Sequence, residues 1–220
     1  MNNAIFDNIL ETIGNTPLIK IKFIKNNWVL LLKMEKFNPG QSMKDRMALN
    51  MINKAEEKKL LKPGGVIIES SSGNTATGLA IVAAVKGYRF IAIVDHHASQ
   101  NKIDIIQAYG GEIIKVGDDY AEDEVAVAER ERIALQLSKK IKNSFFVNQA
   151  DNFYNREAYI DTLAKELQDA VPNLNELFGA IGTGGSLCGT AIGLNKRLLN
   201  VNINAVEPIG SVIFGGNGGP

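Results

Sequence analysis

The sequence of 220 residues lacks several features that would assign it to whole classes of protein. It has a single cysteine, Cys188, so no disulfide can form within the chain and a reducing compartment is the simplest expectation. It has no basic excess, because 24 Lys and Arg balance 24 Asp and Glu, whereas nucleic-acid-binding proteins normally carry one. No apolar run approaches the ~18 residues of a membrane span, and residues 1–10 lack a signal-peptide pattern. We therefore expect a cytoplasmic protein that binds neither nucleic acid nor membrane.

Short apolar runs alternate with longer segments of helical spacing, in a chain whose 45% hydrophobic residues are ordinary for a globular protein. Runs such as Ile91–Val94 are apolar throughout, which is typical of parallel strands that are covered on both faces. The predicted strands are Val29–Glu35, Val66–Ser70, Phe90–Val94, Glu112–Val116, Phe145–Asn148, Phe178–Gly182 and Asn202–Val206. The predicted helices are Lys44–Lys59, Thr75–Lys86, Gln100–Tyr109, Glu122–Lys140, Asn155–Ala170 and Cys188–Asn200.

This alternation of strands and helices predicts an α/β fold with a doubly wound parallel sheet. Gly64, Gly87 and Gly110 follow helical runs, where a left-handed backbone is expected. Because such sheets bind ligands beyond the carboxyl ends of their strands, functional residues are expected in the strand-to-helix loops. Three of these loops carry groups suited to chemistry.

The first loop, Asn38–Arg46, precedes a predicted helix. Ser42 and Asp45 have the spacing of a capping box, so the helix is expected to begin here. Lys44 then lies in the first helical turn, where the helix dipole and burial would lower its pKa and supply a neutral amine for Schiff-base chemistry. The alternative is a surface lysine near a helix cap.

The second loop, Glu69–Thr75, combines consecutive hydroxyls, a glycine and an amide at a helix N-terminus. That combination predicts a site for a carboxylate or a phosphate. The alternative is ordinary helix capping by Ser72 or Asn74.

The third loop, Gly182–Ser186, has glycines that let backbone N–H groups converge, together with two hydroxyl side chains. It predicts a phosphate cradle, although it matches neither the NTPase loop nor the dinucleotide-binding fingerprint.

Taken in this order, the loops resemble the cysteine synthase and cystathionine β-synthase family of fold-type-II pyridoxal-phosphate enzymes. The resemblance is carried by Ile13–Leu18, Asn38–Arg46, Ser71–Thr75 and Gly182–Ser186. It implies two doubly wound parallel-sheet domains, of which the C-terminal one is incomplete. Residues 1–40 would pack on the larger domain, residues 41–150 would form the smaller domain with the substrate loop, and residues 151–220 would begin the larger domain.

The resemblance also implies a role for each site residue. Lys44 would form the aldimine with pyridoxal 5'-phosphate and later remove the substrate α-proton. Asn74 would hydrogen-bond the phenolic oxygen of the cofactor. The substrate would be bound through its carboxylate by Ser71, Ser72, Asn74, Thr75 and Gln149. The cofactor phosphate would be bound by Gly182, Thr183, Gly184, Gly185 and Ser186.

The implied reaction is β-replacement on an activated serine, O-acetylserine or O-phosphoserine, through an aminoacrylate, in a homodimer. Sulfide as the nucleophile would give cysteine. Alternatives are an amino-acid amine, as in diaminopropionate-precursor synthases, a cystathionine β-synthase or cysteine lyase, elimination without replacement, and an inactive relative that binds a partner. Met43 and the segment Glu207–Gly215 resemble the branch that contains cystathionine β-synthase.

The resemblance makes the chain look short, since family members continue well beyond the segment that matches Ser211–Gly215. A fragment, a cleaved chain or a truncated paralogue would each explain this, and a serine or threonine facing the pyridine nitrogen would then be missing. The adjacent His96 and His97 make a poor metal site, and no metal is expected. Cys188 is expected to be a small buried residue.

Overall fold

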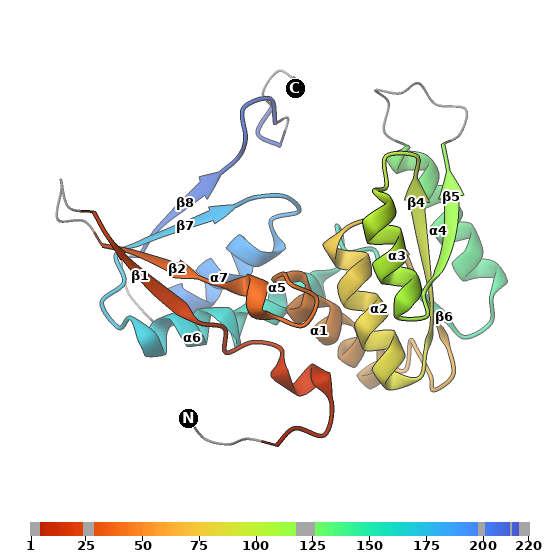
Figure 1. The fold of residues 1–220 in the computed structure, drawn as a ribbon, viewed down its shortest axis with the longest axis horizontal. Coiled ribbons are helices and arrows are strands. Elements are labelled where there is room, and N and C mark those ends of the chain that lie inside the picture. The colour runs from red at the N-terminus through yellow and green to blue at the C-terminus, as the bar shows by residue number, and fades with distance from the viewer. Residues whose placement is uncertain (1–4, 24–28, 118–125, 198–200, 212, 216–220) are drawn as a thin grey trace. The chain divides into compact units, whose positions relative to one another are not determined.

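A computed structural model describes residues 5–23, 29–117, 126–197, 201–211 and 213–215 (Figure 1). The chain divides into two compact units, Met1–Asn152 and Phe153–Pro220, which we call the first and the second unit. The three-part division into residues 1–40, 41–150 and 151–220 stays a prediction.

The elements follow one another in the expected alternation. The first unit contains η1 (Ile9–Thr12), β1 (Leu18–Lys22), β2 (Val29–Lys33), η2 (Glu35–Phe37), α1 (Lys44–Glu57), β3 (Val66–Ser70), α2 (Asn74–Lys86), β4 (Arg89–Asp95), α3 (Gln100–Ala108), β5 (Glu112–Val116), α4 (Val127–Lys140) and β6 (Ser144–Phe146). The second unit contains α5 (Phe153–Ile160), α6 (Leu163–Ala170), β7 (Glu176–Ala180), α7 (Gly185–Asn195) and β8 (Asn202–Val206).

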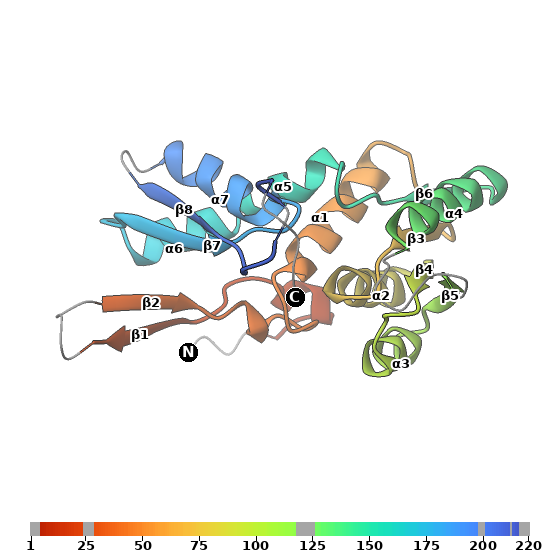
Figure 2. The same ribbon diagram turned by 90° about the horizontal axis from the view of Figure 1, so that it is seen from above.

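A parallel sheet of four strands forms the core of the first unit, in the order β5-β4-β3-β6. The central strands are buried along Val66–Ile68 and Phe90–Val94. Helices α2 and α3 cover one face of the sheet and α4 covers the other (Figure 2), which explains the unbroken apolar runs. The predicted α/β class with parallel sheets is confirmed.

The carboxyl ends of these strands lie at one edge of the sheet, because the strands run in the same direction. The loops at residues 70–74, 95–99 and 147–152 leave this edge after β3, β4 and β6. The second predicted loop and Gln149 are therefore brought to the same edge of the first unit.

The predicted left-handed glycines are confirmed. Gly64, Gly87 and Gly110 have φ values of +72°, +75° and +82°. Gly87 ends α2 with its backbone N–H donating to the carbonyl of Ala83. A residue with a Cβ atom would be strained at each of these three positions.

A two-stranded antiparallel sheet joins β1 to β2, with Ile19 opposite Leu32 and Ile21 opposite Leu30. The sequence analysis missed β1, although apolar and charged residues alternate along it as in a half-buried strand. The predicted strand Val29–Glu35 ends earlier, at Lys33, and Glu35 begins η2 instead.

The predicted helix Asn155–Ala170 is wrong as a single helix, since the structure has α5 and α6 with a break between them. At the break, Arg197 Nη1 donates to the carbonyl of Ile160 at 2.8 Å and Arg197 Nη2 donates to Asp161 Oδ1 at 2.7 Å. That carbonyl would otherwise accept the next helical hydrogen bond. The guanidinium therefore stabilises the end of α5.

Other boundaries shift by a few residues. β7 begins and ends two residues before the predicted strand Phe178–Gly182, and α7 begins three residues before Cys188. The predicted helices Glu122–Lys140 and Cys188–Asn200 extend over residues 122–125 and 198–200, which lie outside the described residues.

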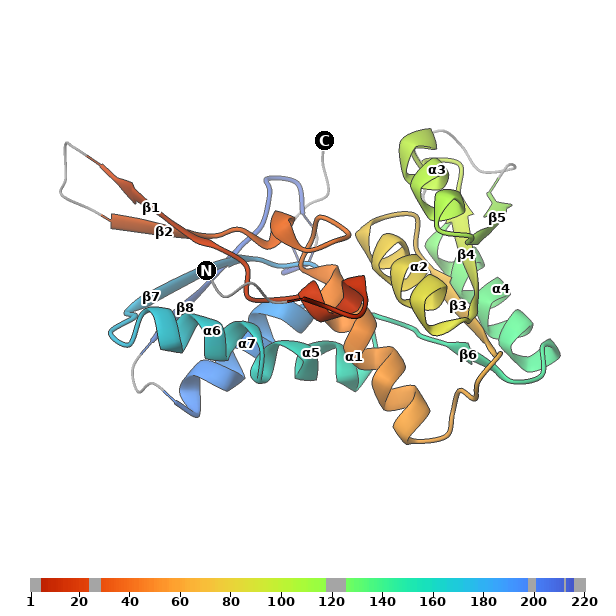
Figure 3. The same cartoon turned by 60° about the horizontal axis from the view of Figure 1, so that its bottom comes forward.

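The second unit has a parallel pair of strands, β7 and β8, with α5, α6 and α7 gathered on one side (Figure 3). Gly185, Gly189 and Gly193 recur every four residues and therefore share one face of α7. A Cβ atom at Gly189 would lie 2.1 Å from the carbonyl oxygen of Arg156, and one at Gly193 would lie 2.5 Å from Ala164 Cβ. The glycines thus allow α7 to approach α5 and α6 closely.

In the part of the chain that the structure describes, none of the helices has the length and apolar character needed to span a bilayer.

Candidate active site

Lys44 is the first residue of α1, as the sequence analysis expected. Its backbone N–H donates to Ser42 Oγ at 3.2 Å, which fixes the entry into the helix. Burial lowers the pKa of the Lys44 amine below the usual value of 10.5. Its position in the first turn acts in the same direction, because a cation opposes the positive end of a helix dipole. The amine is therefore suited to react in its neutral form.

The predicted capping box of Ser42 and Asp45 is wrong, because Asp45 binds a different residue. The Asp45 carboxylate accepts from the backbone N–H of Gly40 and does not reach back to Ser42. A Cβ atom at Gly40 would lie 2.4 Å from Asp45 Oδ1, so a larger residue there would displace the Asp45 carboxylate. Burial raises the pKa of Asp45 to about 6, against the lowering by the Gly40 bond. The loop before Lys44 is thus closed by a buried carboxyl group.

The N-terminal motif has a structural role within the first unit. Thr16 Oγ1 donates to Glu35 Oε1 at 2.6 Å, and the backbone N–H of Gly14 donates to Asn38 Oδ1 at 2.8 Å. Asn38 Nδ2 in turn donates to Glu35 Oε2 at 3.1 Å, and Arg46 donates to both Glu35 oxygens. This buried network joins the motif to α1 two residues after Lys44.

Helix α2 begins at Asn74 with Gly73 as its N-cap residue, and no side chain accepts a hydrogen bond at this cap. The alternative of capping by Ser72 or Asn74 is therefore wrong. Ser71 Oγ instead accepts from the backbone N–H of Gly73 at 3.3 Å. A helix N-terminus whose first N–H groups are left without a side-chain cap suits an anionic ligand.

Asn74 is exposed, and its Oδ1 accepts from Lys102 Nζ at 2.7 Å. Because an ammonium group can only donate, this contact identifies the amide oxygen and leaves the NH₂ group as the donor end. A donor at Asn74 agrees with its expected partner, a phenolic oxygen. Sequence reasoning gave Lys102 no role, since it lies 28 residues away on α3.

Thr75 and Gln149 are brought together, as the sequence analysis expected. Thr75 Oγ1 donates to Gln149 Oε1 at 2.6 Å. Glu69, to which sequence reasoning gave no separate role, accepts from the backbone N–H groups of Ser70 and Gln149 at 2.8 and 3.2 Å. Burial raises the pKa of Glu69 to about 7. The available signal was a lone carboxylate in a strand that is otherwise apolar.

Helices α1 and α2 approach each other through Gly78. A Cβ atom at Gly78 would lie 3.2 Å from Ala48 Cβ and 3.3 Å from the carbonyl oxygen of Lys44. The second turn of α2 therefore lies against the first turn of α1. The backbone of Lys44 is thus packed against α2 within the first unit.

The third predicted loop, Gly182–Ser186, lies in the second unit, and α7 begins within it. Gly184 is the N-cap residue with φ +80°, a conformation that favours glycine. A Cβ atom at Gly185 would lie 2.3 Å from Asn155 Oδ1, and Asn155 Nδ2 donates to Thr183 Oγ1 at 3.4 Å. This glycine turn at a helix N-terminus fits a phosphate group.

His96, His97 and Cys188, which the sequence analysis considered separately, are not part of the three predicted loops. His96 and His97 stack with ring centroids 4.1 Å apart, and no cluster of metal-ligating side chains occurs among the described residues. Cys188 is exposed in the first turn of α7, so its predicted burial is wrong.

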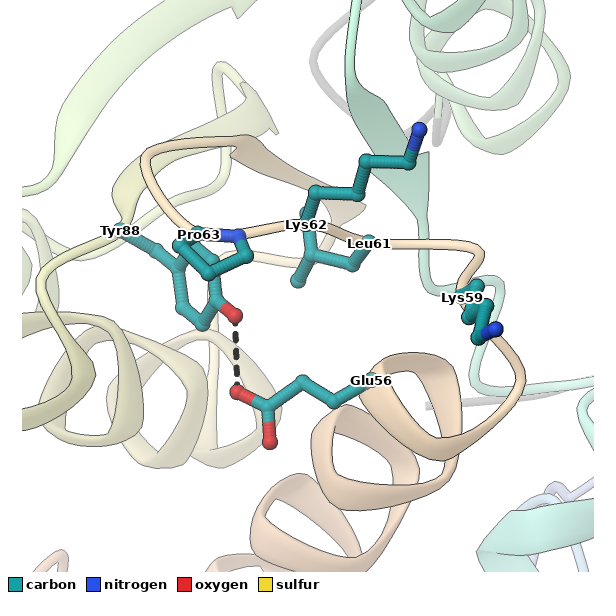
Figure 4. Close-up of a pocket in the computed structure, with 6 residues that line it drawn as sticks. All are labelled: Glu56, Lys59, Leu61, Lys62, Pro63 and Tyr88. Atoms are coloured by element: carbon teal, nitrogen blue, oxygen red, sulfur yellow. Dashed lines mark hydrogen bonds between the residues drawn. The ribbon is translucent and has the colours of Figure 1, made fainter.

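A pocket of about 390 Å³ lies away from these loops, lined by Glu56, Lys59, Leu61, Lys62, Pro63 and Tyr88 (Figure 4). Tyr88 donates to Glu56 Oε1 at 2.8 Å, and burial together with that carboxylate raises the pKa of Tyr88 to about 12. Pro63 and Tyr88 precede β3 and β4, so the pocket is at the amino ends of the strands. It has no part in the candidate site.

The profile of the family described as "Pyridoxal-phosphate dependent enzyme" matches residues 9–218. The chain belongs to this family. A candidate cysteine synthase of Sinorhizobium fredii is 47% identical over 215 residues, which are 96% of this chain and 63% of that protein. The chain thus spans less than two thirds of the length of that relative.

Two solved structures extend the likeness to the fold. A hydrogen sulfide-producing enzyme of Fusobacterium nucleatum is 36% identical, with a TM-score of 0.90 over 100% of this chain and 71% of that one. An O-acetylserine dependent cystathionine beta-synthase of Helicobacter pylori is 31% identical, with a TM-score of 0.89 over 99% of this chain and 71% of that one.

Each unit, taken by itself, has residues that fit one part of pyridoxal phosphate, the cofactor of this family. In the first unit, burial favours the neutral amine of Lys44, which a carbonyl group requires for covalent attachment. In the second unit, the left-handed Gly184 and the close approach at Gly185 form a turn where only small residues fit. Amine and phosphate loop are the anchors that a phosphorylated aldehyde needs.

Proposed function

We propose that this chain belongs to an enzyme that replaces a leaving group on Cβ of an activated serine. The observation that carries the proposal is the desolvated amine of Lys44, on a helix whose first turn packs against α2. A base for the α-proton and a site for the α-carboxylate are the two protein groups that the reaction requires at one amino acid. The family membership and the named relatives support the same chemistry.

The proposed roles follow the local geometry. When bound, the cofactor would supply an electron-withdrawing ring that stabilises negative charge at the substrate α-carbon. Lys44 would hold the cofactor and then take the α-proton, and the leaving group would depart from Cβ with the bonding electrons. A nucleophile would add at Cβ while the proton returns to Cα.

The remaining proposed contacts hold the ligands. Ser71, Ser72 and Thr75 would bind the substrate carboxylate together with Gln149, and Asn74 would donate to the phenolic oxygen of the cofactor. The phosphate would be bound by five residues of the second unit, Gly182, Thr183, Gly184, Gly185 and Ser186.

We propose sulfide as the nucleophile, with cysteine as the product, and O-acetylserine or O-phosphoserine as the donor. The names of the Sinorhizobium and Fusobacterium relatives support sulfur chemistry, and that of the Helicobacter protein supports O-acetylserine as donor. We also propose that the protein is a cytoplasmic homodimer. Sedimentation as a monomer would contradict the dimer.

The first experiment adds pyridoxal phosphate to the purified chain and records the visible spectrum before and after borohydride. We expect a shifted, reducible band in the wild type and in Lys58→Ala, which removes an exposed lysine at the other end of α1. Lys44→Ala should lack it. If the wild type lacked this band, the proposed pyridoxal-phosphate-dependent activity would be contradicted.

The second experiment compares nucleophiles. Sulfide and glutamate are offered with O-acetylserine or O-phosphoserine, and product masses are measured. Cysteine as the main product supports the proposal, a diaminopropionate precursor would assign the amine branch, and loss of the donor without a new bond at Cβ would indicate elimination.

A further inference from the structure

Glu69 is a buried carboxylate that links two loops of the first unit. It lies in β3 one residue before the strand ends, and only 3% of its surface is exposed. Its Oε1 accepts from the backbone N–H of Ser70, and its Oε2 accepts from that of Gln149, which is 80 residues away. Each oxygen therefore holds a different loop at the carboxyl edge of the sheet.

The charges around Glu69 do not compensate for its burial. Arg130 of α4 lowers the pKa of Glu69 less than burial raises it, and Glu131 of α4 raises it further. Arg130 instead forms an ion pair with Asp95 at the end of β4, at 3.3 Å. An apolar residue would occupy this strand position without the cost of desolvating a carboxylate.

We propose that Glu69 is a positioning residue, which holds the Gln149 loop against the Ser70–Asn74 loop so that Gln149 and Thr75 bind the substrate carboxylate together. The inference rests on the proposed function for the identity of that ligand. The link between the loops rests on the hydrogen bonds alone.

The connection continues beyond Glu69 to the expected ligand site. The backbone of Gln149 is held by Glu69, and its side-chain Oε1 is held by Thr75 at 2.6 Å. Thr75 lies in the first turn of α2, whose N-terminus faces the proposed carboxylate position. A carboxylate can accept two N–H groups at once, whereas an amide has one accepting oxygen and a donating NH₂ group.

Positioning and charge predict opposite effects for Glu69→Gln. If Glu69 acted only through its negative charge, its removal would tighten the binding of a substrate carboxylate. If it positions the loops, Glu69→Gln weakens that binding, because the amide can hold only one of the two N–H groups. The matched control is Glu131→Gln, which removes a nearby exposed carboxylate that makes no hydrogen bond to either loop.

The binding test titrates the cofactor-loaded chain with L-alanine, which has no leaving group on Cβ, and follows the cofactor absorbance. We expect Kd to rise about tenfold in Glu69→Gln, corresponding to one lost hydrogen bond, with the reducible Lys44 band retained. Glu131→Gln should bind like the wild type, and Glu69→Asp should lie between. Unchanged or tighter binding by Glu69→Gln overturns the proposal, as a purely structural role would leave this Kd unmoved.

A second test needs no cofactor. In the apo chain, the amide signals of Ser70 and Gln149 are followed by NMR from pH 5 to pH 9. Both should titrate with one midpoint near 7, set by Glu69, and the midpoint should disappear in Glu69→Gln. A Gln149 signal that does not move overturns the link between Glu69 and the Gln149 loop. A wild type that takes up no cofactor would refute the proposed function, but the NMR test would still decide whether Glu69 links the loops.

Discussion

The Arg46 guanidinium binds both oxygens of the Glu35 carboxylate, with Nε at 2.7 Å from Oε2 and Nη2 at 2.8 Å from Oε1. The two side chains are 1% and 10% exposed. Thr16 and Asn38 donate to the same carboxylate, so its lone pairs are well satisfied. The pair therefore connects the N-terminal segment to the first turn of the helix that begins at Lys44.

Breaking this pair should destabilise the first unit strongly. Glu35→Gln removes the carboxylate that binds the buried Arg46 guanidinium, and breaking a buried ion pair typically costs about 3–5 kcal/mol. Urea unfolding measures the loss, and Arg89→Met is the control. Arg89 pairs with Glu112 in an exposed bridge, so its removal should cost less than about 1 kcal/mol. Equal losses in the two variants would contradict the importance of burial.

Asp45 should make stability depend on pH. Its pKa is about 6 in the folded chain against 3.8 in the unfolded one, so the folded state binds more protons between these values. The free energy of unfolding therefore falls as pH rises from about 4 to about 6, by up to roughly 3 kcal/mol from this group.

Asp45→Asn should remove that part of the pH dependence while the amide oxygen still accepts from Gly40. Denaturant melts at pH 4, 5, 6 and 7 measure the slope. Asp104→Asn, at an exposed position on α3, should give the slope of the wild type. Parallel profiles for Asp45→Asn and the wild type would show that the carboxyl group titrates normally.

Gly189→Ala should destabilise the second unit, although alanine normally stabilises a helix by about 1 kcal/mol relative to glycine. The added Cβ would lie 2.1 Å from the Arg156 carbonyl, so α5 and α7 must move apart, at a cost of about 1–3 kcal/mol. Cys188→Ala, on the exposed side of the same helix, is the control for thermal melting. A higher melting temperature for Gly189→Ala would rule out this close packing.

Sequence reasoning located features that depend on neighbouring residues and missed those that depend on distant ones. The starts of α1 and α2 follow from local polar and glycine residues, so they were predicted within a residue or two. Glu69 was missed because its partner Gln149 is 80 residues away. The break after α5 was also missed, and Arg197, which binds the carbonyl at that break, is 37 residues away from it.

Lys44 should react with small carbonyl compounds before the exposed lysines do, even in the apo chain. Burial lowers its pKa, so at pH 7.5 a larger fraction of this amine is neutral and nucleophilic than it would be at the usual value of 10.5. Limited treatment with formaldehyde and a mild borohydride reductant, followed by peptide mass mapping, gives the order of modification. Formaldehyde is small enough to reach a half-buried amine, and exposed Lys36 in the same digest is the reference.

The rate at Lys44 should level off at a lower pH than the rate of a free lysine side chain in a model peptide, because the neutral fraction saturates above the pKa. That profile separates a lowered pKa from simple accessibility, which would change the rate without moving its midpoint. A Lys44 midpoint at or above that of the peptide would mean that burial does not favour the neutral amine. The covalent role proposed for Lys44 would then lose its physical basis, whatever the family membership implies.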